Sequence, residues 1–203
     1  MDLGIFLGTL AGLVHIIAYI TYNHRILKDK FGPNNTTWTL LMFLALLNSS
    51  SYLKMSQDVV KSILPIISAI FRFITFSLII AKGKWKKLDK AEYTVLIIGI
   101  IAGIMWYILK NATYANLLLQ LAYLIAIFPT YRSIWKNKSK ESFTPWFLWG
   151  CGHSLGIATV LSRWSGQYQD LAFSSVGAIV HFIAAFLTLR KSNHHQTKYF
   201  LKN

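Results

Sequence analysis

The chain has 203 residues, of which 54% are hydrophobic and 14% are charged, and its formal net charge is +14. Soluble globular domains carry about 25% charged residues and do not gather their apolar residues into long blocks. The composition therefore excludes an ordinary soluble domain and is typical of a membrane protein.

In chain order, the apolar residues form seven blocks. Each block has about the 17–25 residues that a helix needs to cross a hydrocarbon core of about 30 Å. The first block follows Met1 and Asp2 without a positively charged segment or a small-residue cleavage site, so we expect a span there and not a signal peptide. We therefore expect an all-α membrane protein with seven transmembrane helices. The blocks are 3–21, 37–54, 58–81, 93–109, 114–132, 144–162 and 169–189.

The positive charge lies mainly on one side of the expected membrane. The connections on that side, together with Arg132 and the chain from Arg190 onward, carry 16 of the 21 Lys and Arg residues. Because cytoplasmic loops are enriched in Lys and Arg, this pattern predicts a plasma (inner) membrane protein with its N-terminus outside and its C-terminus in the cytoplasm. The basic loops then lie against anionic lipid, so the charge requires no nucleic-acid partner. These connections are 22–36, 82–92 and 133–143, and the opposite side carries Lys54, Lys61, Lys110 and Arg163.

The chain contains an internal repeat. A shift of 108 residues aligns Ala18–Met42 with Ala126–Gly150 and gives seven identical pairs, and a shift of 109 aligns Arg72–Lys82 with His181–Lys191 and gives four. Since three spans are an odd number, one further span between the copies gives both the same orientation, which predicts two parallel repeats in a 3+1+3 layout with a substrate site between them. The expected parts are a first three-helix repeat at 1–82, a linker helix at 83–112, a second three-helix repeat at 113–192 and a basic tail at 193–203.

The stretch FPTYRSIWKNKSKESFTPWFLW, residues 128–149, resembles the SWEET/PQ-loop superfamily of seven-span transporters. That superfamily has a proline-glutamine pair near the cytoplasmic end of the fifth span, followed by a basic loop and a sixth span that contains tryptophan. Here Pro129 matches the proline and Thr130 stands in place of the glutamine, while the first repeat has Thr21-Tyr22 and no proline. The resemblance implies two rocking bundles with a hinge at Pro129, and the alternative for this residue is a simple helix-end proline.

Arg72 lies in the middle of the third block, where a charged side chain costs about 2.5–3.5 kcal/mol on insertion scales. None of the seven Asp and Glu residues lies within a span core. We therefore expect Arg72 to face the interior, where it binds an anionic ligand or, alternatively, bonds carbonyls and hydroxyls of neighbouring spans.

Three histidines lie within expected spans: His181, opposite Arg72 in the repeat, His153 and His15. Imidazoles titrate near physiological pH, so these residues are candidates for proton coupling. Neutral histidines that hydrogen-bond between helices are the alternative. No metal site is expected, because the three come from different spans and have no acidic or cysteine co-ligand.

The sixth block carries an aromatic and polar face, on which Trp146, Trp149, His153 and Gly156 recur at helical spacing. Such a face suits a small ligand with polar and apolar sides, and ordinary helix packing is the alternative. Trp38 and Trp146, near the cytoplasmic ends, have the alternative role of interfacial anchors. The expected substrate-binding residues are Arg72, His181, His153, Trp149, Asn48, Gln120 and Tyr123.

No combination of nucleophile, base and acid, no phosphate loop and no carboxylate pair stands out in the sequence, and the single cysteine, Cys151, allows no internal disulfide. We therefore expect neither an enzyme nor a cofactor. The expected function is that of a multi-pass carrier for a small polar metabolite (a sugar, amino acid, vitamin or organic anion), with alternating access between two bundles. The alternative is a non-transporting receptor, sorting factor or assembly partner on the same scaffold. Two repeats in one chain make a monomer sufficient, and a homo-oligomer stays open.

Overall fold

The computed structural model describes residues 2–28, 33, 35–82, 90–109, 111–136 and 141–200. This part of the chain folds into seven α-helices and one 3₁₀ turn, without a β-strand. Each predicted block matches one α-helix, except that block 58–81 begins at the N-cap of the third helix and block 169–189 begins in the 3₁₀ turn before the last. The prediction of an all-α fold with seven long helices is confirmed for the described residues. The elements are α1 (Leu3–Leu27), α2 (Asn35–Ser56), α3 (Val59–Ala81), α4 (Lys90–Leu109), α5 (Ala112–Trp135), α6 (Phe143–Ser162), η1 (Tyr168–Leu171) and α7 (Ala172–Phe200).

Four helical segments are long and apolar enough to cross a membrane, namely Leu3–Leu27, Val59–Ala81, Ala112–Trp135 and Tyr168–Arg190. The helix α3 shows how their residues are distributed. Ile70 and Phe73 are each 53% exposed on the outside of the bundle, whereas Arg72 is only 5% exposed and Thr75 is fully buried. An apolar exterior around a polar interior is the reverse of a soluble protein and is the arrangement that a hydrocarbon solvent requires. These features indicate a membrane protein.

Side chains at one end of the bundle cap three helices. Asp2 Oδ1 accepts from the N–H of Ile5 at 3.1 Å, Asp58 Oδ1 from the N–H of Val60 at 2.8 Å, and Asn111 Oδ1 from the N–H of Tyr114 at 3.2 Å. These bonds satisfy first-turn N–H groups that have no partner within the helix.

The start of α6 differs slightly from the sequence-based expectation. The predicted block begins at residue 144, whereas the helix begins one residue earlier at Phe143, with Ser142 as its N-cap. Pro145 still lies in the first turn, where its missing N–H breaks no helical hydrogen bond.

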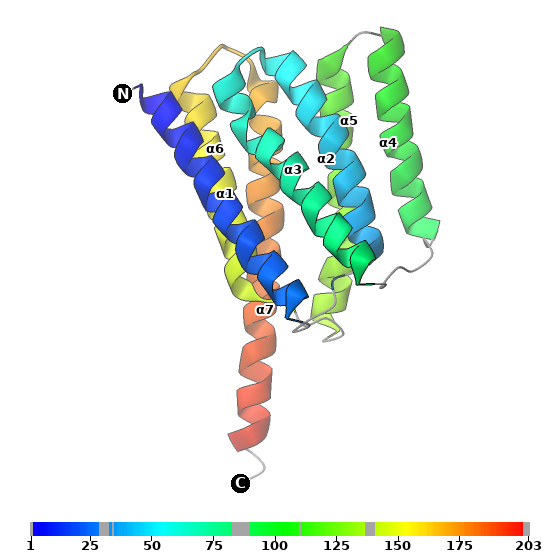
Figure 1. Cartoon of the computed structure of the whole chain (residues 1–203), viewed down its shortest axis with the longest axis vertical. Coiled ribbons are helices and arrows are strands. Elements are labelled where there is room, and N and C mark those ends of the chain that lie inside the picture. The colour runs from blue at the N-terminus through cyan, green and yellow to red at the C-terminus, as the bar shows by residue number, and fades with distance from the viewer. Residues whose placement is uncertain are drawn as a thin grey trace.

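The helix contacts within α1–α3 and within α5–α7 follow the same pattern, and we call each of these groups a trio. The helix α3 packs against both α1 and α2, and α7 packs against both α5 and α6. Between the trios, α1 contacts α6 and α2 contacts α5. Because α5 takes the place of α1 and α6 the place of α2 in the second trio, these two contacts correspond to each other. The helix α4 packs outside the trios against α5 and α2 (Figure 1).

The two ends of the chain lie at opposite ends of the bundle, as an odd number of crossings requires (Figure 1). The helices α1, α3 and α5 finish at the same end, where α7 continues beyond the others to Phe200. The helix thus takes in residues 193–200 of the segment that was expected to be a separate tail, while 201–203 and most of the basic connections lie outside the described residues.

Candidate functional site

Polar and aromatic side chains from five helices meet in the middle of the bundle. We call this group the central cluster, and all of its members are less than 8% exposed. It contains five of the seven residues expected to bind substrate, together with His15 from the set expected to couple protons. Its members are His15 and Tyr19 on α1, Arg72 on α3, Tyr123 on α5, Trp149 and His153 on α6, and His181 on α7.

Arg72 crosses the interface between the trios, and the acceptors around it are neutral. Its Nε donates to the hydroxyl of Tyr19 at 3.2 Å, its Nη2 to the hydroxyl of Tyr123 at 3.3 Å, and its Nη1 to the backbone carbonyl of Leu41 at 3.4 Å. The guanidinium carbon also lies 5.0 Å from the centre of the Tyr123 ring, within cation–π range. Among the described residues no carboxylate forms an ion pair with Arg72. Its positive charge is therefore hydrogen-bonded without being neutralised.

The three histidines form a contiguous group. The ring centres of His15 and His153 are 4.9 Å apart and nearly perpendicular, and those of His153 and His181 are also 4.9 Å apart but stacked. His15 Nε2 lies 3.0 Å from the Ser68 hydroxyl, and His181 bonds to Tyr123 and to the carbonyl of Gly177. The sequence predicted these histidines as site residues, but their separate spans gave no sign that the rings would touch.

At the end of the bundle where α1, α3 and α5 finish, tryptophan and tyrosine side chains close the space between the trios. Trp38 Nε1 donates to the Tyr22 hydroxyl at 2.9 Å, and that hydroxyl lies 3.2 Å from Glu141 Oε1. Trp146 Nε1 donates to the other carboxylate oxygen at 3.0 Å. Trp38 and Trp146 are only 4% and 2% exposed, and Trp149 packs against both. The interpretation of Trp38 and Trp146 as interfacial anchors is therefore wrong, because both rings are buried between the trios.

Towards the other end, carboxamides form a second polar group. Asn116 Nδ2 donates to Asn48 Oδ1 at 2.9 Å and to the Ser51 hydroxyl at 3.1 Å, and Gln120 Nε2 donates to the same Asn48 oxygen at 2.5 Å. Asn48 and Gln120 were expected in the site, whereas Asn116 was missed. Its position one turn before Gln120 on the same helical face was the available signal.

Two small cavities adjoin Arg72, and each has room for about one water molecule. Arg72 and Tyr123 line both, so this pair separates them. The first cavity is also lined by Tyr19, Trp38, Leu41, Trp146, Trp149 and His181, and the second by Leu44, Asn48, Leu119, Gln120 and Phe173. Six of the seven residues expected to bind substrate thus line one cavity or the other. His153 lies behind His181 and Phe173 instead.

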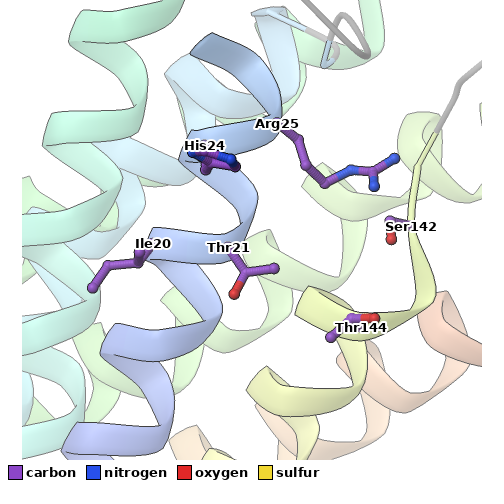
Figure 2. A pocket seen from close by; sticks show the side chains of 6 residues that line it. All are labelled: Ile20, Thr21, His24, Arg25, Ser142 and Thr144. Carbon is purple, nitrogen blue, oxygen red and sulfur yellow. The ribbon is translucent and has the colours of Figure 1, made fainter. Parts of the chain in front are cut away.

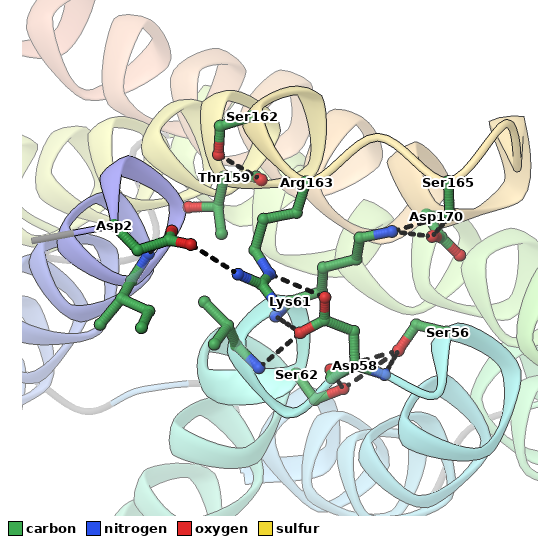
Figure 3. A network of polar contacts seen from close by, with 12 residues as sticks. Asp2, Ser56, Asp58, Lys61, Ser62, Thr159, Ser162, Arg163, Ser165 and Asp170 are labelled. Atoms are coloured by element: carbon green, nitrogen blue, oxygen red, sulfur yellow. Dashed lines mark hydrogen bonds and ion pairs between the residues drawn. The ribbon is translucent and has the colours of Figure 1, made fainter.

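Ion pairs hold the trios together at the end opposite the basic connections (Figure 3). Lys61 Nζ lies 2.7 Å from Asp170 Oδ2, with both side chains only 1% exposed, and Ser165 bonds to both partners. Arg163 Nε bonds to Asp58 at 2.7 Å. The block bounds 58–81 and 169–189 put both acidic residues at span ends, but their basic partners, more than 100 positions away, could not be assigned from the sequence alone.

The environment of Asp58 lowers the pKa of its carboxyl group. Partial burial raises the pKa, but the bond from Arg163 and the N–H groups of Lys61 and Val60 outweigh this effect, so the net shift is downward from the ordinary value. Arg163 also reaches Asp2 on α1 at 3.5 Å, so one guanidinium connects three helix ends.

A wider groove of about 390 Å³ lies on the perimeter between α1 and the start of α6 (Figure 2). His24, Arg25 and three hydroxyl residues line it, which is a combination that can bind an anion. It shares no lining residue with the two interior cavities and is not part of the central cluster. The lining residues are Ile20, Thr21, His24, Arg25, Ser142 and Thr144.

Pro129 lies inside α5, six residues before its last residue Trp135, and not at the helix end. Because proline has no N–H, the carbonyl of Ile125 lacks its normal helical partner. Within the described residues, no group of three or more His, Cys, Asp or Glu side chains is arranged to hold a metal ion.

Comparison of the chain with protein-family models, with curated proteins and with solved structures found no match.

Proposed function

We propose that this protein is a seven-span membrane carrier for a small polar metabolite, in which α1–α3 and α5–α7 are two parallel bundles and α4 links them. The observation that carries the proposal is Arg72, a buried arginine with neutral acceptors, placed between two small cavities at the interface of the trios. Charged residues inside a membrane are rare and usually mark a substrate or ion pathway.

The helix contacts support the two-bundle layout. In both trios the third helix contacts the other two, and the inter-trio contacts α1–α6 and α2–α5 correspond to each other when the trios are exchanged. The basic connections all follow α1, α3 and α5, which favours the topology with this end in the cytoplasm of a plasma (inner) membrane. Parallel repeats with a site between them are one of the recurring transporter architectures.

Alternating access needs a closure on each side of the site, and the structure has a candidate for each. The ion pairs of Lys61 and Arg163 join the trios on the outer side, and the contacts of Tyr22, Trp38 and Trp146 with Glu141 join them on the inner side. With both closed, the described conformation corresponds to an occluded carrier. Rocking of the trios then breaks one closure at a time, with Pro129 as a weak point in α5.

The side chains around the cavities favour a substrate with an anionic or strongly accepting group. Arg72 provides N–H donors and an uncompensated positive charge, and Trp149 Nε1 is a buried donor without a hydrogen-bond partner in the described structure. Tyr123 and His181 complete the first cavity, and the amides of Asn48 and Gln120 provide polar contacts in the second.

A second candidate function is a non-transporting receptor, sorting factor or assembly partner. The observation that favours it is the size of the two interior cavities, each of which holds about one water molecule and not a metabolite. In that case the hydrogen bonds of Arg72 stabilise the helix interface, and the basic connections contact a protein partner.

Uptake by reconstituted vesicles tests the carrier. Purified protein is assayed against radiolabelled sugars, amino acids, carboxylates and vitamins, and at least one should be accumulated or exchanged. Arg72→Gln should abolish that uptake, whereas the matched variant Arg132→Gln, at an exposed arginine outside the central cluster, should retain it. Absence of uptake for the whole panel, or equal uptake by both variants, contradicts the proposal, and retained partner binding by Arg72→Gln favours the receptor.

A further inference from the structure

The histidine group contains buried ring nitrogens without partners. Three of its six ring nitrogens, His15 Nδ1 and both nitrogens of His153, accept or donate no hydrogen bond in the described structure. Both residues are fully buried. Such orphaned polar atoms are uncommon in protein interiors, since leaving them unpaired is unfavourable, and they point to a ligand or a proton that occupies the site in part of the functional cycle.

The hydrogen bonds of His181 are compatible with a neutral imidazole. Arg72 can only donate, so the Tyr123 hydroxyl accepts from it and donates its own proton to His181 Nε2. The carbonyl of Gly177 can only accept, so His181 Nδ1 carries the hydrogen in that bond. With these bonds a neutral His181 has both of its ring nitrogens satisfied. The group able to accept a further proton is the pair of His153 and His15.

The charged and titratable groups that face this pair come from every helix around it. They are Tyr19 on α1, Arg72 on α3 and His181 on α7, with Tyr123 on α5 bonded to both Arg72 and His181, and of these only Arg72 is charged. The carboxylates of Glu141 and Asp170 lie at the two ends of the bundle, bonded to the tryptophan closure and to Lys61 respectively. A second positive charge on the histidines is thus opposed by Arg72 until an anion neutralises the guanidinium.

We propose that His153 and His15 share one proton, which binds together with the anionic group of the substrate at Arg72, so that the carrier moves an anion and a proton together. This inference rests on the proposed carrier function. The proton comes from water on the side to which the site is open, forms an N–H bond on a free imidazole nitrogen, and returns to water when the anion leaves. The anion and the proton together add no net charge, so the loaded site carries the same charge as the empty site and the cycle moves no net charge across the membrane.

Formate is a suitable probe, because it is the smallest carboxylate and the cavities beside Arg72 are small. Protein labelled with ¹⁵N at histidine is titrated with pH in the presence and absence of sodium formate, and imidazole nitrogen shifts distinguish neutral from protonated rings. With formate, one buried imidazole should become charged at a pH where it is neutral without formate. Calorimetry in buffers of different ionisation enthalpy should show about one proton taken up per formate bound.

The variant Arg132→Gln, at an exposed arginine outside both the central cluster and the perimeter groove, should retain the formate-dependent signal, and His153→Gln should lose it. The wild-type titration stands by itself if His153→Gln does not fold. Formate binding without proton uptake, or no effect of formate on any imidazole nitrogen shift, overturns the inference. The inference is also overturned if the imidazole shifts respond to stoichiometric Zn²⁺ and not to formate. Vesicle uptake that is independent of a pH gradient overturns the proposed proton coupling but not the proposed carrier function. Proton uptake on formate binding, without transport of any substrate into vesicles, contradicts the carrier function.

Discussion

The two sets of ion pairs at the outer end should contribute very differently to stability, although their shortest distances are the same. Lys61 and Asp170 are each 1% exposed at a separation of 2.7 Å, whereas Arg163 and Asp58, also 2.7 Å apart, are 28% and 19% exposed. Removing one partner of a buried pair leaves an uncompensated charge and costs about 3–5 kcal/mol. Partly exposed pairs are screened by water and contribute about 0.2–1 kcal/mol.

We therefore expect Asp170→Asn and Lys61→Met each to lower the free energy of unfolding by about 3–5 kcal/mol. The double variant buries no charge at this position, so its loss should be smaller than the sum of the two single losses by about 2–3 kcal/mol, as is found for residues in direct contact. Arg163→Gln should lower the free energy of unfolding by about 1 kcal/mol or less.

Equilibrium unfolding in mixed micelles, followed by circular dichroism, measures all four variants under the same conditions. A repeat at high salt provides a control, because salt screens the exposed pair more than the buried pair. Additive losses in the Lys61 and Asp170 variants would refute the reasoning. Single losses as small as that of Arg163→Gln would refute it as well, since burial would then have no energetic consequence.

The remaining predictions concern a titrating carboxylate and close packing. Because the pKa of Asp58 is lowered from 3.8 in the folded protein, its contribution to stability is present above that value and is lost as pH falls through the lower folded pKa. The difference in unfolding midpoint between wild type and Asp58→Asn should therefore shrink on acidification below about pH 4. A difference that stays constant with pH would contradict this expectation. Gly177→Ala places a Cβ in steric conflict with the ring of His153 and should destabilise the protein by about 1–3 kcal/mol. Gly103→Ala, whose Cβ would be 3.8 Å from its nearest neighbour, should be neutral or stabilising in the same unfolding assay, and equal effects of the two variants would contradict the described packing. Asn116→Leu removes the donor to the carboxamide group and should lower the free energy of unfolding by about 1–3 kcal/mol, with retained stability as the contrary result.

Much of the site could be predicted because a membrane restricts where polar residues can lie. The inward position of Arg72, His153 and His181 follows from the high free energy of exposing such groups to hydrocarbon, and all three are buried. The same reasoning failed for Trp38 and Trp146, because tryptophan is stable both at a membrane interface and in a packed core. Sequence spacing alone does not distinguish these two environments.

The sequence by itself determined the number and approximate bounds of the helices, since hydrophobic block length depends only on local composition and on the thickness of a bilayer. Only the tertiary structure decided which side chains meet. The contact of His15 with His153, the hydrogen bonds of Arg72 to Tyr19 and Tyr123, and the pairing of Lys61 with Asp170 all join residues at least 50 positions apart. Such contacts depend on how helix faces rotate against one another, and that rotation is set by the packing of the whole bundle and not by any single segment.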